Sequence, residues 1–335
     1  MNTDSEDFLV DSLHFLALTG LPIHFLGFYF ILCNTPVTMK SVKLPMLYLH
    51  FWNVVWDVYL SILYVPFVVF PFPAGYTLGL ISSDFLNFTQ QSCIAVTLLV
   101  MIGSANVFFF ANRYNRICML GKPMKKRKKF ILIGLNLLFA ICSPIPINFL
   151  PVDQSYAKKF ILKTIPSFSR EILKRDDFRV ICLHKEYLVI SLLIIIAVIG
   201  IQLIRLIVKI SLELHYSLQA SINSASTRTF NIQKAFFYTI CFQTSIPVIG
   251  ISFPVFYMIY SYFTYYFDQS YNNFAIIALS LYGQISTMTM IFVHKPYRKK
   301  FLGAFDPREF FTRKTKSIPE VRTNISTASN IKTFT

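Results

Sequence analysis

An acidic residue, Asp57, stands inside a stretch of apolar residues that runs from about 46 to 70. A charge in the middle of a hydrocarbon layer costs about 2.5 to 3.5 kcal/mol on insertion scales, so such an acid needs a polar partner or an ion. Asn53 and Ser61 lie one helical turn to either side, on the same face. The stripe fits two roles: a sodium or proton site at Asp57, or a neutral, hydrogen-bonded acid that holds helices together.

A second polar stripe lies in the last apolar stretch, from about 271 to 293. Ser280, Gln284 and Thr287 follow one another at spacings of four and three, which places them on one face of a helix. We therefore expect a hydrogen-bonded network between the two stripes. No metal centre is indicated elsewhere, because the histidines are scattered and no cysteines have the CxxC spacing of a zinc site.

These stripes belong to a set of seven apolar runs, each long enough to cross a bilayer. A hydrocarbon core of about 30 Å takes about 20 helical residues. Because 54% of the residues are hydrophobic and only 14% charged, a soluble domain of this size would expose far too much apolar surface. The sequence predicts an all-α membrane protein, a seven-transmembrane helix bundle. The runs lie near 12–33, 46–70, 88–112, 130–150, 186–210, 235–260 and 271–293.

The basic residues are unevenly distributed among the gaps, and lysine and arginine are retained on the cytoplasmic side of membranes. Residues 1–11 and two later gaps contain none, whereas the alternate gaps and the C-terminal part hold 2, 8, 4 and 10 of the 32 lysines and arginines. The remaining eight lie in residues 151–185, the longest gap, and long loops cross membranes despite their charge. We therefore expect an extracellular N-terminus and a cytoplasmic C-terminus.

The net charge of +16 follows from this topology and suits an anionic inner leaflet, so membrane lipids are expected partners and nucleic acid is not. After the last run, Phe301, Phe305 and Phe310 alternate with cations, as in a helix that lies along a membrane surface. The predicted organisation is a short extracellular N-terminus at 1–11, the helix bundle at 12–293, an amphipathic membrane-surface helix at 294–311 and a disordered cytoplasmic tail at 312–335.

The outer face carries two candidate modifications. Cys93 and Cys182 fall on the oxidising side, where a disulfide would tie the long loop to the bundle, but the place of Cys93 inside its run leaves the pairing open. Asn87 begins the glycosylation sequon Asn-Phe-Thr, close to the membrane. The sequence has no HExxH, GxSxG or Walker A pattern, so no enzyme activity and no cofactor are expected.

The inner end of the third run and the middle of the sixth are candidates for movement or contact. Arg113, Tyr114 and Arg116 lie in the sequence NRYNR, which suits either an interfacial anchor or a cytoplasmic contact for a partner protein. Pro247 and Pro254 in the sixth run each remove a backbone hydrogen bond and bend a helix. A bent crossing helix is a candidate moving part, although prolines are also common in membrane helices that do not move.

Several motifs together resemble those of the nematode serpentine receptor class H chemoreceptors. They are Leu21–Trp52 (LPIHFLGFYFILCNTPVTMKSVKLPMLYLHFW), Asp57, AGYTLG at 74–79, NRY at 112–114 and HKPYR at 294–298. The resemblance covers roughly residues 10 to 305, and sister nematode receptor classes share the general plan.

The resemblance implies a G-protein-coupled receptor in the plasma membrane of chemosensory neurons, in their sensory cilia, that responds to a small-molecule ligand and acts on a heterotrimeric G protein. Arg113 and Tyr114 would stand where rhodopsin-like receptors keep a G-protein-facing Asp-Arg-Tyr element, with Arg116 beside them. Asn112 replaces the acid, so an Asp–Arg lock within that helix cannot form. Pro296 and Tyr297 are similar to the proline-tyrosine end of helix 7, without an NPxxY motif.

The expected mechanism is a ligand-driven shift between two packings of the bundle. The ligand would bind among the outer halves of the helices, with Phe253, Phe256 and Tyr257 as weak candidates for its pocket. A G protein would then recognise the Arg113 region, a loop at 211–233 and the basic segment after the last run. Two other classes remain open: a ligand-gated channel of inverted topology and a small-molecule transporter. The sequence indicates no oligomeric state.

Overall fold

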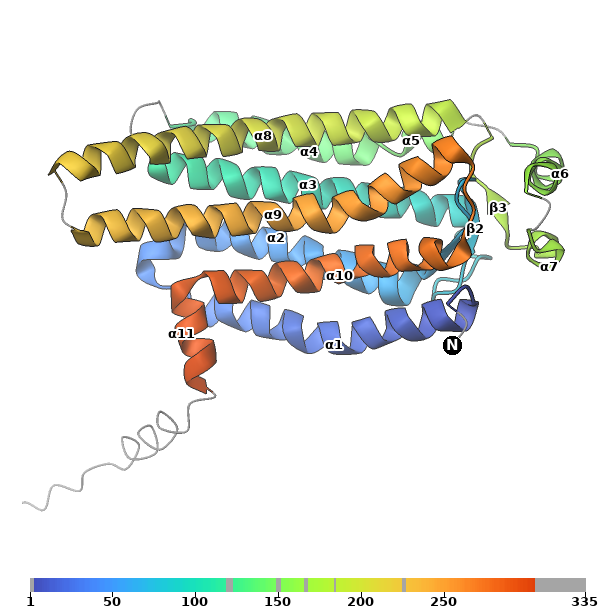
Figure 1. Ribbon diagram of the computed structural model, residues 1–335, viewed down its shortest axis with the longest axis horizontal. Coiled ribbons are helices and arrows are strands. Elements are labelled where there is room, and N and C mark those ends of the chain that lie inside the picture. The colour runs from blue at the N-terminus through green and yellow to red at the C-terminus, as the bar shows by residue number, and fades with distance from the viewer. Residues whose placement is uncertain are drawn as a thin grey trace, which may run out of the picture.

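The computed structural model is an elongated bundle of helices that run side by side, with the N-terminus at one end and α11 at the other (Figure 1). It describes residues 3–118, 123–148, 152–165, 168–183, 185–224 and 227–304. We call the end with the N-terminus the outer end and the opposite end the inner end. The lengthwise helices are α1 (Glu6–Cys33), α2 (Lys40–Val58), α3 (Phe88–Ile117), α4 (Lys126–Cys142), α8 (Lys185–Ser224), α9 (Thr227–Thr264) and α10 (Gln269–Val293).

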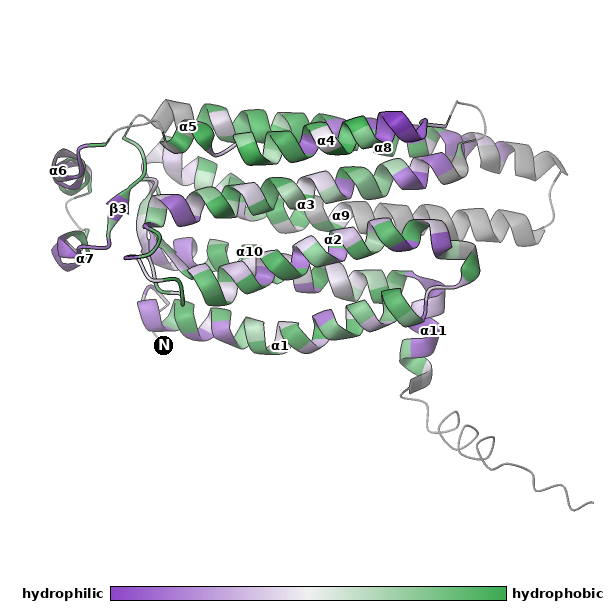
Figure 2. Cartoon of the chain, turned by 180° about the vertical axis from the view of Figure 1, so that it is seen from behind, coloured by the Kyte–Doolittle hydropathy of each residue, from purple (hydrophilic) through white to green (hydrophobic). Residues whose placement is uncertain are grey.

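Apolar residues predominate along the lengthwise helices (Figure 2). Many of the large apolar side chains are exposed on the outside of the bundle, whereas many polar side chains are buried in its interior. On α1, for example, Phe15, Leu18 and Phe25 are 63%, 71% and 71% exposed. This inside-out pattern is what a lipid environment favours. Among the described residues, five helical segments are long and apolar enough to cross a membrane: Glu6–Cys33, Lys40–Tyr64, Phe88–Asn115, Val189–Glu213 and Gln269–Val293.

The long helices begin where a capping residue meets an apolar run. Ser5 accepts a hydrogen bond from the backbone N–H of Phe8 and starts α1, and Asp268 caps α10 in the same way. Asn87 starts α3 in a reciprocal capping box with Gln90. These side chains satisfy donors that the first turn of a helix leaves without partners.

The second apolar run does not remain helical as far as residue 70. After α2 the chain forms a short π-helix, η2 (Tyr59–Tyr64), and Val65 then turns it with φ of 40°. Pro66 begins strand β1 (Pro66–Val68), which pairs antiparallel with β2 (Ala74–Thr77), and β2 pairs with β3 (Arg179–Val180). The residue before a proline disfavours the helical conformation, so the helix ends here although the sequence stays apolar.

The sheet and two short helices close the outer end of the bundle. Helices α6 (Gln154–Thr164) and α7 (Arg170–Lys174) lie in the long gap, next to β3 (Figure 1). We call β1, β2, β3, α6 and α7 the outer lid. The short elements η1 (Val37–Met39) and α5 (Ile145–Asn148) complete the connections, and α11 (Lys295–Ala304) leaves the inner end at a steep angle to α10.

The expected loop at 211–233 is mostly helical. Helix α8 continues to Ser224 and α9 starts at Thr227, so the pair projects beyond the other helices at the inner end (Figure 1). Phe305, Phe310 and the predicted tail at 312–335 lie outside the described residues.

Two hydrophobic clusters fill the bundle. The outer core extends from the middle of the helices into the outer lid, and the inner core lies between α1, α2, α3, α8, α10 and α11. The outer core includes Trp56, Tyr59, Tyr64, Phe67, Tyr76, Phe88 and Phe178. The inner core includes Phe30, Met46, Phe109, Phe110, Met290 and Tyr297.

Candidate functional site

A buried pair of Asp57 and His24 lies between the two cores. His24 Nε2 is 2.9 Å from Asp57 Oδ2, and the two residues are 3% and 4% exposed. The histidine comes from α1 and the acid from α2. Because a buried charge is stabilised by a hydrogen-bonded partner, the pair explains how this part of the bundle accommodates an acid.

The predicted contact between the polar stripes of α2 and α10 runs through histidines. Thr287 Oγ1 on α10 is 3.4 Å from His24 Nδ1 and 3.2 Å from His50 Nδ1, and it also lies 2.9 Å from the carbonyl oxygen of Gly283. His50 Nε2 lies 3.0 Å from the carbonyl oxygen of His24. Three helices therefore meet at the hydroxyl of Thr287.

The hydrogen-bond partners fix where the protons in this network reside. A carbonyl oxygen only accepts, so His50 Nε2 donates to the carbonyl oxygen of His24, and the Nδ1 of a neutral His50 carries no proton. The single hydroxyl proton of Thr287 therefore faces two acceptors, the carbonyl oxygen of Gly283 at 2.9 Å and His50 Nδ1 at 3.2 Å. The oxygen of Thr287 is then free to accept from Nδ1–H of His24. In the arrangement that satisfies both rings, one proton lies between His24 Nε2 and Asp57 Oδ2, and the pair is neutral as a whole.

The other members of the two stripes also lie within this polar layer. Asn53 donates to Ser286 Oγ at 3.0 Å, Gln284 donates to the carbonyl oxygen of Leu16 at 2.8 Å, and Ser61 donates to the carbonyl oxygen of Asp57. Ser280 is fully buried. Within the two stripes, three buried oxygens have no hydrogen-bond partner among the described residues: Asn53 Oδ1, Asp57 Oδ1 and Ser280 Oγ.

Three glycines allow the helices to approach closely enough for these contacts. A Cβ at Gly283 would lie 2.3 Å from Asp57 Oδ2, and a Cβ at Gly27 would lie 2.6 Å from the His50 ring. A Cβ at Gly20 would lie 2.8 Å from Gln284 Nε2. Small residues are the usual means by which membrane helices approach one another.

A small polar cavity adjoins this network on its inner side. It has a volume of about 40 Å³ and lies between α2, α3, α9 and α10. Its polar wall is formed by His50, Asn53, Asn106, Ser286 and Thr287. A cavity of this size and lining has room for about two or three waters.

Arg113 is buried at the inner end, where it contacts the end of α10. Its Nη2 donates to His294 Nε2 at 2.7 Å, and its guanidinium lies 5.0 Å from the centre of the Phe109 ring. The carbonyl oxygen of Met290 accepts from His294 Nδ1 at 2.9 Å, so Nε2 is the bare nitrogen of a neutral ring. Burial and the neighbouring Arg113 lower the pKa of His294 to about 3, which keeps the ring neutral.

The neighbours of Arg113 have other partners. Asn112 Oδ1 accepts a hydrogen bond from Lys129 Nζ at 3.0 Å, so Asn112 faces α4. The hydroxyl oxygen of Tyr114 accepts a hydrogen bond from the thiol of Cys118. On α11, Tyr297 is fully buried and its hydroxyl lies 2.7 Å from Thr35 Oγ1, while Pro296 is exposed. The side chain of Arg116 lies outside the described part of the structure.

The aromatic residues proposed for a ligand pocket are separated by the structure. Phe253 and Phe256 lie on the outside of α9, 67% and 69% exposed, where lipid would cover them. Tyr257 is half-buried and donates to Asn272 Oδ1 at 3.0 Å, which ties α9 to α10. Pro254 is buried within α9, and the side chain of Pro247 lies outside the description.

The two candidate modification sites lie toward the outer end. Cys93 and Cys182 are both buried, and β3, just before Cys182, packs against α3. The Sγ of Cys93 is 3.9 Å from the carbonyl oxygen of Pro144. Asn87 is partly exposed and uses Oδ1 in its capping box.

Sequence reasoning missed His24, His50 and His294 as members of these sites. The available signal was a histidine within or at the end of an apolar run, where a polar ring needs a partner. His50 and Asn53 are three residues apart, so His50 could have been included in the stripe of Asp57.

Long apolar helices around a buried acid–histidine network define an integral membrane protein. The model of the serpentine type 7TM GPCR chemoreceptor family Srh matches residues 4–306, and the chain belongs to that family. The serpentine receptor class H-72 of Caenorhabditis elegans is 27% identical over 308 residues, which cover 88% of this chain and 84% of that receptor. The resemblance seen in the sequence is thereby confirmed.

Proposed function

We propose that this chemoreceptor binds a small environmental molecule within its helix bundle and signals through a heterotrimeric G protein. The observation that carries the proposal is the closed inner end, where Arg113 is 4% exposed and bonded to His294. A G protein needs an accessible inner surface. The packing in which Arg113 contacts His294 would then be the resting state, and signalling would require α3 to separate from the end of α10.

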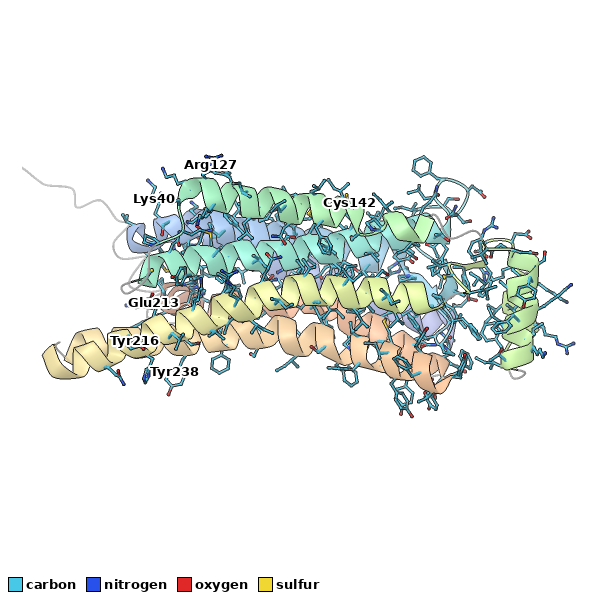
Figure 3. All side chains as sticks on the ribbon, turned by 90° about the horizontal axis from the view of Figure 1, so that it is seen from above. Lys40, Arg127, Cys142, Glu213, Tyr216 and Tyr238 are labelled. Carbon is cyan, nitrogen blue, oxygen red and sulfur yellow. The ribbon has the colours of Figure 1, made fainter. Side chains whose placement is uncertain are left out.

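The proposed topology has seven crossings, α1, α2, α3, α4, α8, α9 and α10, with the N-terminus outside. Lys40 and Arg127 lie at the inner end of the bundle, as does the base of the projecting α8–α9 pair with Glu213, Tyr216 and Tyr238 (Figure 3). An excess of lysine and arginine at one end is the usual mark of the cytoplasmic side. The receptor would act in the plasma membrane of chemosensory neurons, in their sensory cilia.

Coupling between the ligand and the inner end would pass through α10. This helix carries Thr287 at the polar network and ends next to His294, seven residues further on. A ligand that shifts α10 against α1 and α2 would also change the position of His294. The energy needed is small, because a ligand that prefers one packing by about 1.4 kcal/mol changes its population ratio tenfold.

The test is G-protein activation in cells that express the receptor with tags at both ends. We expect the N-terminal tag to be accessible on intact cells, the C-terminal tag only after permeabilisation, and an odorant library to give nucleotide exchange on a co-expressed G protein. Arg113→Gln should abolish the response at equal surface expression, while Lys299→Gln, an exposed cation on α11, should not. Ligand-evoked current that persists without G protein would contradict the proposal and favour a channel.

For Asp57 we propose a proton shared with His24 in place of a sodium ion. The neutral pair leaves no net charge for a monovalent cation to balance. Replacing external and internal sodium with choline should therefore leave ligand potency unchanged. A several-fold shift in potency on removal of sodium would contradict this assignment.

We also propose that Cys93 and Cys182 pair and that Asn87 carries a glycan. Cys182 follows β3, which packs against α3, and α3 carries Cys93, so a disulfide between the two would join the outer lid to the bundle. Peptide mapping without reduction should recover the two cysteines in one linked peptide. Asn87→Gln should increase electrophoretic mobility as enzymatic deglycosylation of the native protein does, and an unchanged mobility would exclude the glycan.

A further inference from the structure

A long groove runs along the outside of α10 in the inner half of the bundle. Helix α10 packs against α9 on one side and α1 on the other (Figure 1). The groove has a volume of about 460 Å³, within the range of about 300 to 1,000 Å³ that is usual for ligand pockets. Apart from Gln284 and Thr289 its lining is apolar, and it consists of Ile23 of α1, Phe242 of α9 and Leu281, Ile285, Met288, Phe292 and Val293 of α10.

The groove faces the hydrocarbon layer. Ile285 and Phe292 on its floor are 47% and 38% exposed, and Phe242 on its α9 wall is 61% exposed. The amide of Gln284 already donates to the carbonyl oxygen of Leu16 at 2.8 Å. A polar ligand therefore gains little in this groove, whereas an apolar chain meets apolar side chains along its whole length.

The length of the groove matches one leaflet of a bilayer. Its lining on α10 extends from Leu281 to Val293, twelve residues that span about 18 Å of helix. Half of a hydrocarbon core measures about 15 Å. Leu281 lies in the middle of α10 and Val293 is its last residue, so the groove covers the depth of a single acyl chain.

Helix α11 places cations at the inner end of the groove. Arg298 Nη1 donates to the carbonyl oxygen of Phe292 at 3.1 Å, which holds the guanidinium next to the last groove residues. Arg298 is exposed, and a guanidinium has five N–H donors, so others can bind phosphate oxygens. Lys295 is also exposed and lies one helical turn before Arg298, on the same face of α11.

Packing fixes α11 in the orientation that presents these cations. The ring of Phe301 lies 5.3 Å from that of Phe292, and Tyr297 is fully buried with its hydroxyl 2.7 Å from Thr35 Oγ1. The helix leaves α10 at a steep angle, so it would lie along the membrane surface at the level of the phosphate groups (Figure 1). Cations held in place in this way lose little conformational entropy on binding.

We propose that the groove binds one acyl chain of an anionic phospholipid, while Arg298 and Lys295 hold its phosphate group. The apolar walls complement the chain, and the two exposed cations complement the charge of the headgroup. The assignment to the inner leaflet rests on the proposed topology, whereas binding itself depends neither on orientation nor on G-protein coupling.

The test is photolabelling of the full-length receptor in lipid nanodiscs with a phosphatidylglycerol that carries a diazirine on one acyl chain. We expect labelled peptides from residues 281–293, and their labelling should fall when unmodified phosphatidylglycerol is added in excess. Phosphatidylcholine with the same acyl chains has no net charge. It should compete about 25-fold less well, because each of two cations near an anionic headgroup contributes about fivefold.

A matched pair of arginine variants tests the role of the cations. Arg298→Gln removes the cation next to the groove, and Arg127→Gln removes an exposed arginine of α4, also at the inner end (Figure 3). The preference for phosphatidylglycerol over phosphatidylcholine should fall about fivefold in the first variant and stay native in the second. Equal preferences in both variants would overturn the proposal, since any lipid preference would then belong to the basic inner end as a whole.

A second pair tests the groove itself. Thr289→Trp fills the groove, and Leu138→Trp adds the same ring on the outside of α4, where Leu138 is 58% exposed. Labelling of residues 281–293 should fall about tenfold in the first variant only. Even labelling over the lipid-facing sides of α4, α8 and α10 would mean annular lipid alone and would overturn the proposal. Arg298 lies on the surface, so the arginine pair decides the matter even if Thr289→Trp does not fold.

The outcome for this site can be separated from that for the proposed function, because both leaflets of a nanodisc contain the probe. Specific labelling of a receptor whose C-terminal tag is extracellular would keep the lipid site and overturn the proposed topology. Odorant-evoked G-protein activation without specific labelling would overturn the lipid site and leave the proposed function intact.

Discussion

The two ends of the bundle are closed in different ways. At the outer end a three-stranded sheet provides backbone hydrogen bonds, and Gln269 and Asn272 of α10 donate to the carbonyl oxygens of Val68 and Phe70. At the inner end, α3 meets α10 through the side chains of Arg113 and His294. Backbone pairing opens only when the sheet itself is disrupted, whereas a side-chain contact opens with a rotamer change or a small helix shift.

This difference shows where a receptor of this kind can move. The outer lid, with the aromatic residues beneath it, holds α1, α3 and α10 in fixed positions. At the inner end, α3 and α10 are joined by a contact between the charged guanidinium of Arg113 and the neutral ring of His294. Proteins place their moving parts in regions of low local stability, so we expect changes in the outer lid to alter stability and changes at the inner end to alter signalling.

The largest effect is expected from Gly75→Ala in the outer lid. A Cβ at Gly75 would lie 2.1 Å from the backbone oxygen of Phe67 on the neighbouring strand, and neither backbone can move without breaking the sheet. The expected loss in free energy of unfolding is about 3 kcal/mol or a failure to fold. The measurement is the melting temperature in detergent, or the folded yield if none is obtained.

Gly134→Ala is the matched control, because a Cβ there meets nothing within 4 Å on the outside of α4. It should leave the melting temperature unchanged or raise it, by an amount that corresponds to at most about 1 kcal/mol. Similar losses in the two variants would show that the outer lid has no special rigidity.

The second prediction concerns the inner end. His294→Lys places a cation against Arg113, so the resting contact should be lost and signalling without ligand should rise about tenfold, which corresponds to about 1.4 kcal/mol. His294→Gln keeps an acceptor for the guanidinium and should stay near the native level. The readout is G-protein activation at equal surface expression, with Lys299→Ala on α11 as control. If all three variants signal alike, the contact does not hold the resting state.

The sequence predicted the presence of the polar layer and its two stripes because helical spacing is a local property. Asp57 and Thr287 were expected to belong to one network, and the structure places both within reach of His24. The histidines themselves were missed, since their contacts depend on the close approach of α1, α2 and α10. That approach is set by Gly20, Gly27 and Gly283, whose effect appears only when the helices are packed.

The outer lid was not predicted at all. Residues 65–70 continue an apolar run, and length and hydropathy alone extend the helix through them. The only local signal was Pro66, and the partner of β2 in β3 lies more than a hundred residues away. Non-local strand pairing of this kind has no periodic signature when the strands are two to four residues long.

The third prediction is a dependence of stability on pH that originates at the inner end. His294 has its pKa lowered to about 3, from an ordinary value of about 6.5, and it faces Arg113 of α3 and Tyr297 of α11. At a pH between about 3 and about 6.5, His294 is protonated in the unfolded chain and neutral in the folded chain. The folded state therefore loses stability as the pH falls below about 6.5, by about 1.4 kcal/mol per unit.

Comparison with His294→Gln isolates this contribution, because all other titrating groups are common to the two proteins. Lowering the pH from about 7.5 to about 5.5 should reduce the melting temperature more in the native protein, with a difference of about 1.4 kcal/mol. An equal reduction in both proteins would mean that His294 takes up a proton in the folded state. The resting contact with Arg113 would then lack its acceptor.

The smallest effect is expected from Arg175→Ala, at the polar edge of the outer lid. Arg175 bonds to Asp177 at 2.9 Å and to Glu6 at 3.3 Å, and its guanidinium lies 4.1 Å from the centre of the Tyr76 ring. The bond to Asp177 raises the pKa of Arg175, but the side chain is 36% exposed, so solvent screens these ion pairs. The loss should be about 0.5 to 1 kcal/mol, mostly from the contact with the ring.

Arg170→Ala, which removes an exposed cation on α7, provides the baseline for this small difference. Basal signalling should remain native in both variants, since the sheet still closes the outer end without Arg175. If Arg175→Ala instead raised basal signalling as much as His294→Lys does, the outer ion pairs would be part of the switch. The contrast between a rigid outer end and a releasable inner end would then be wrong, and α1, through Glu6, would be the element that links them.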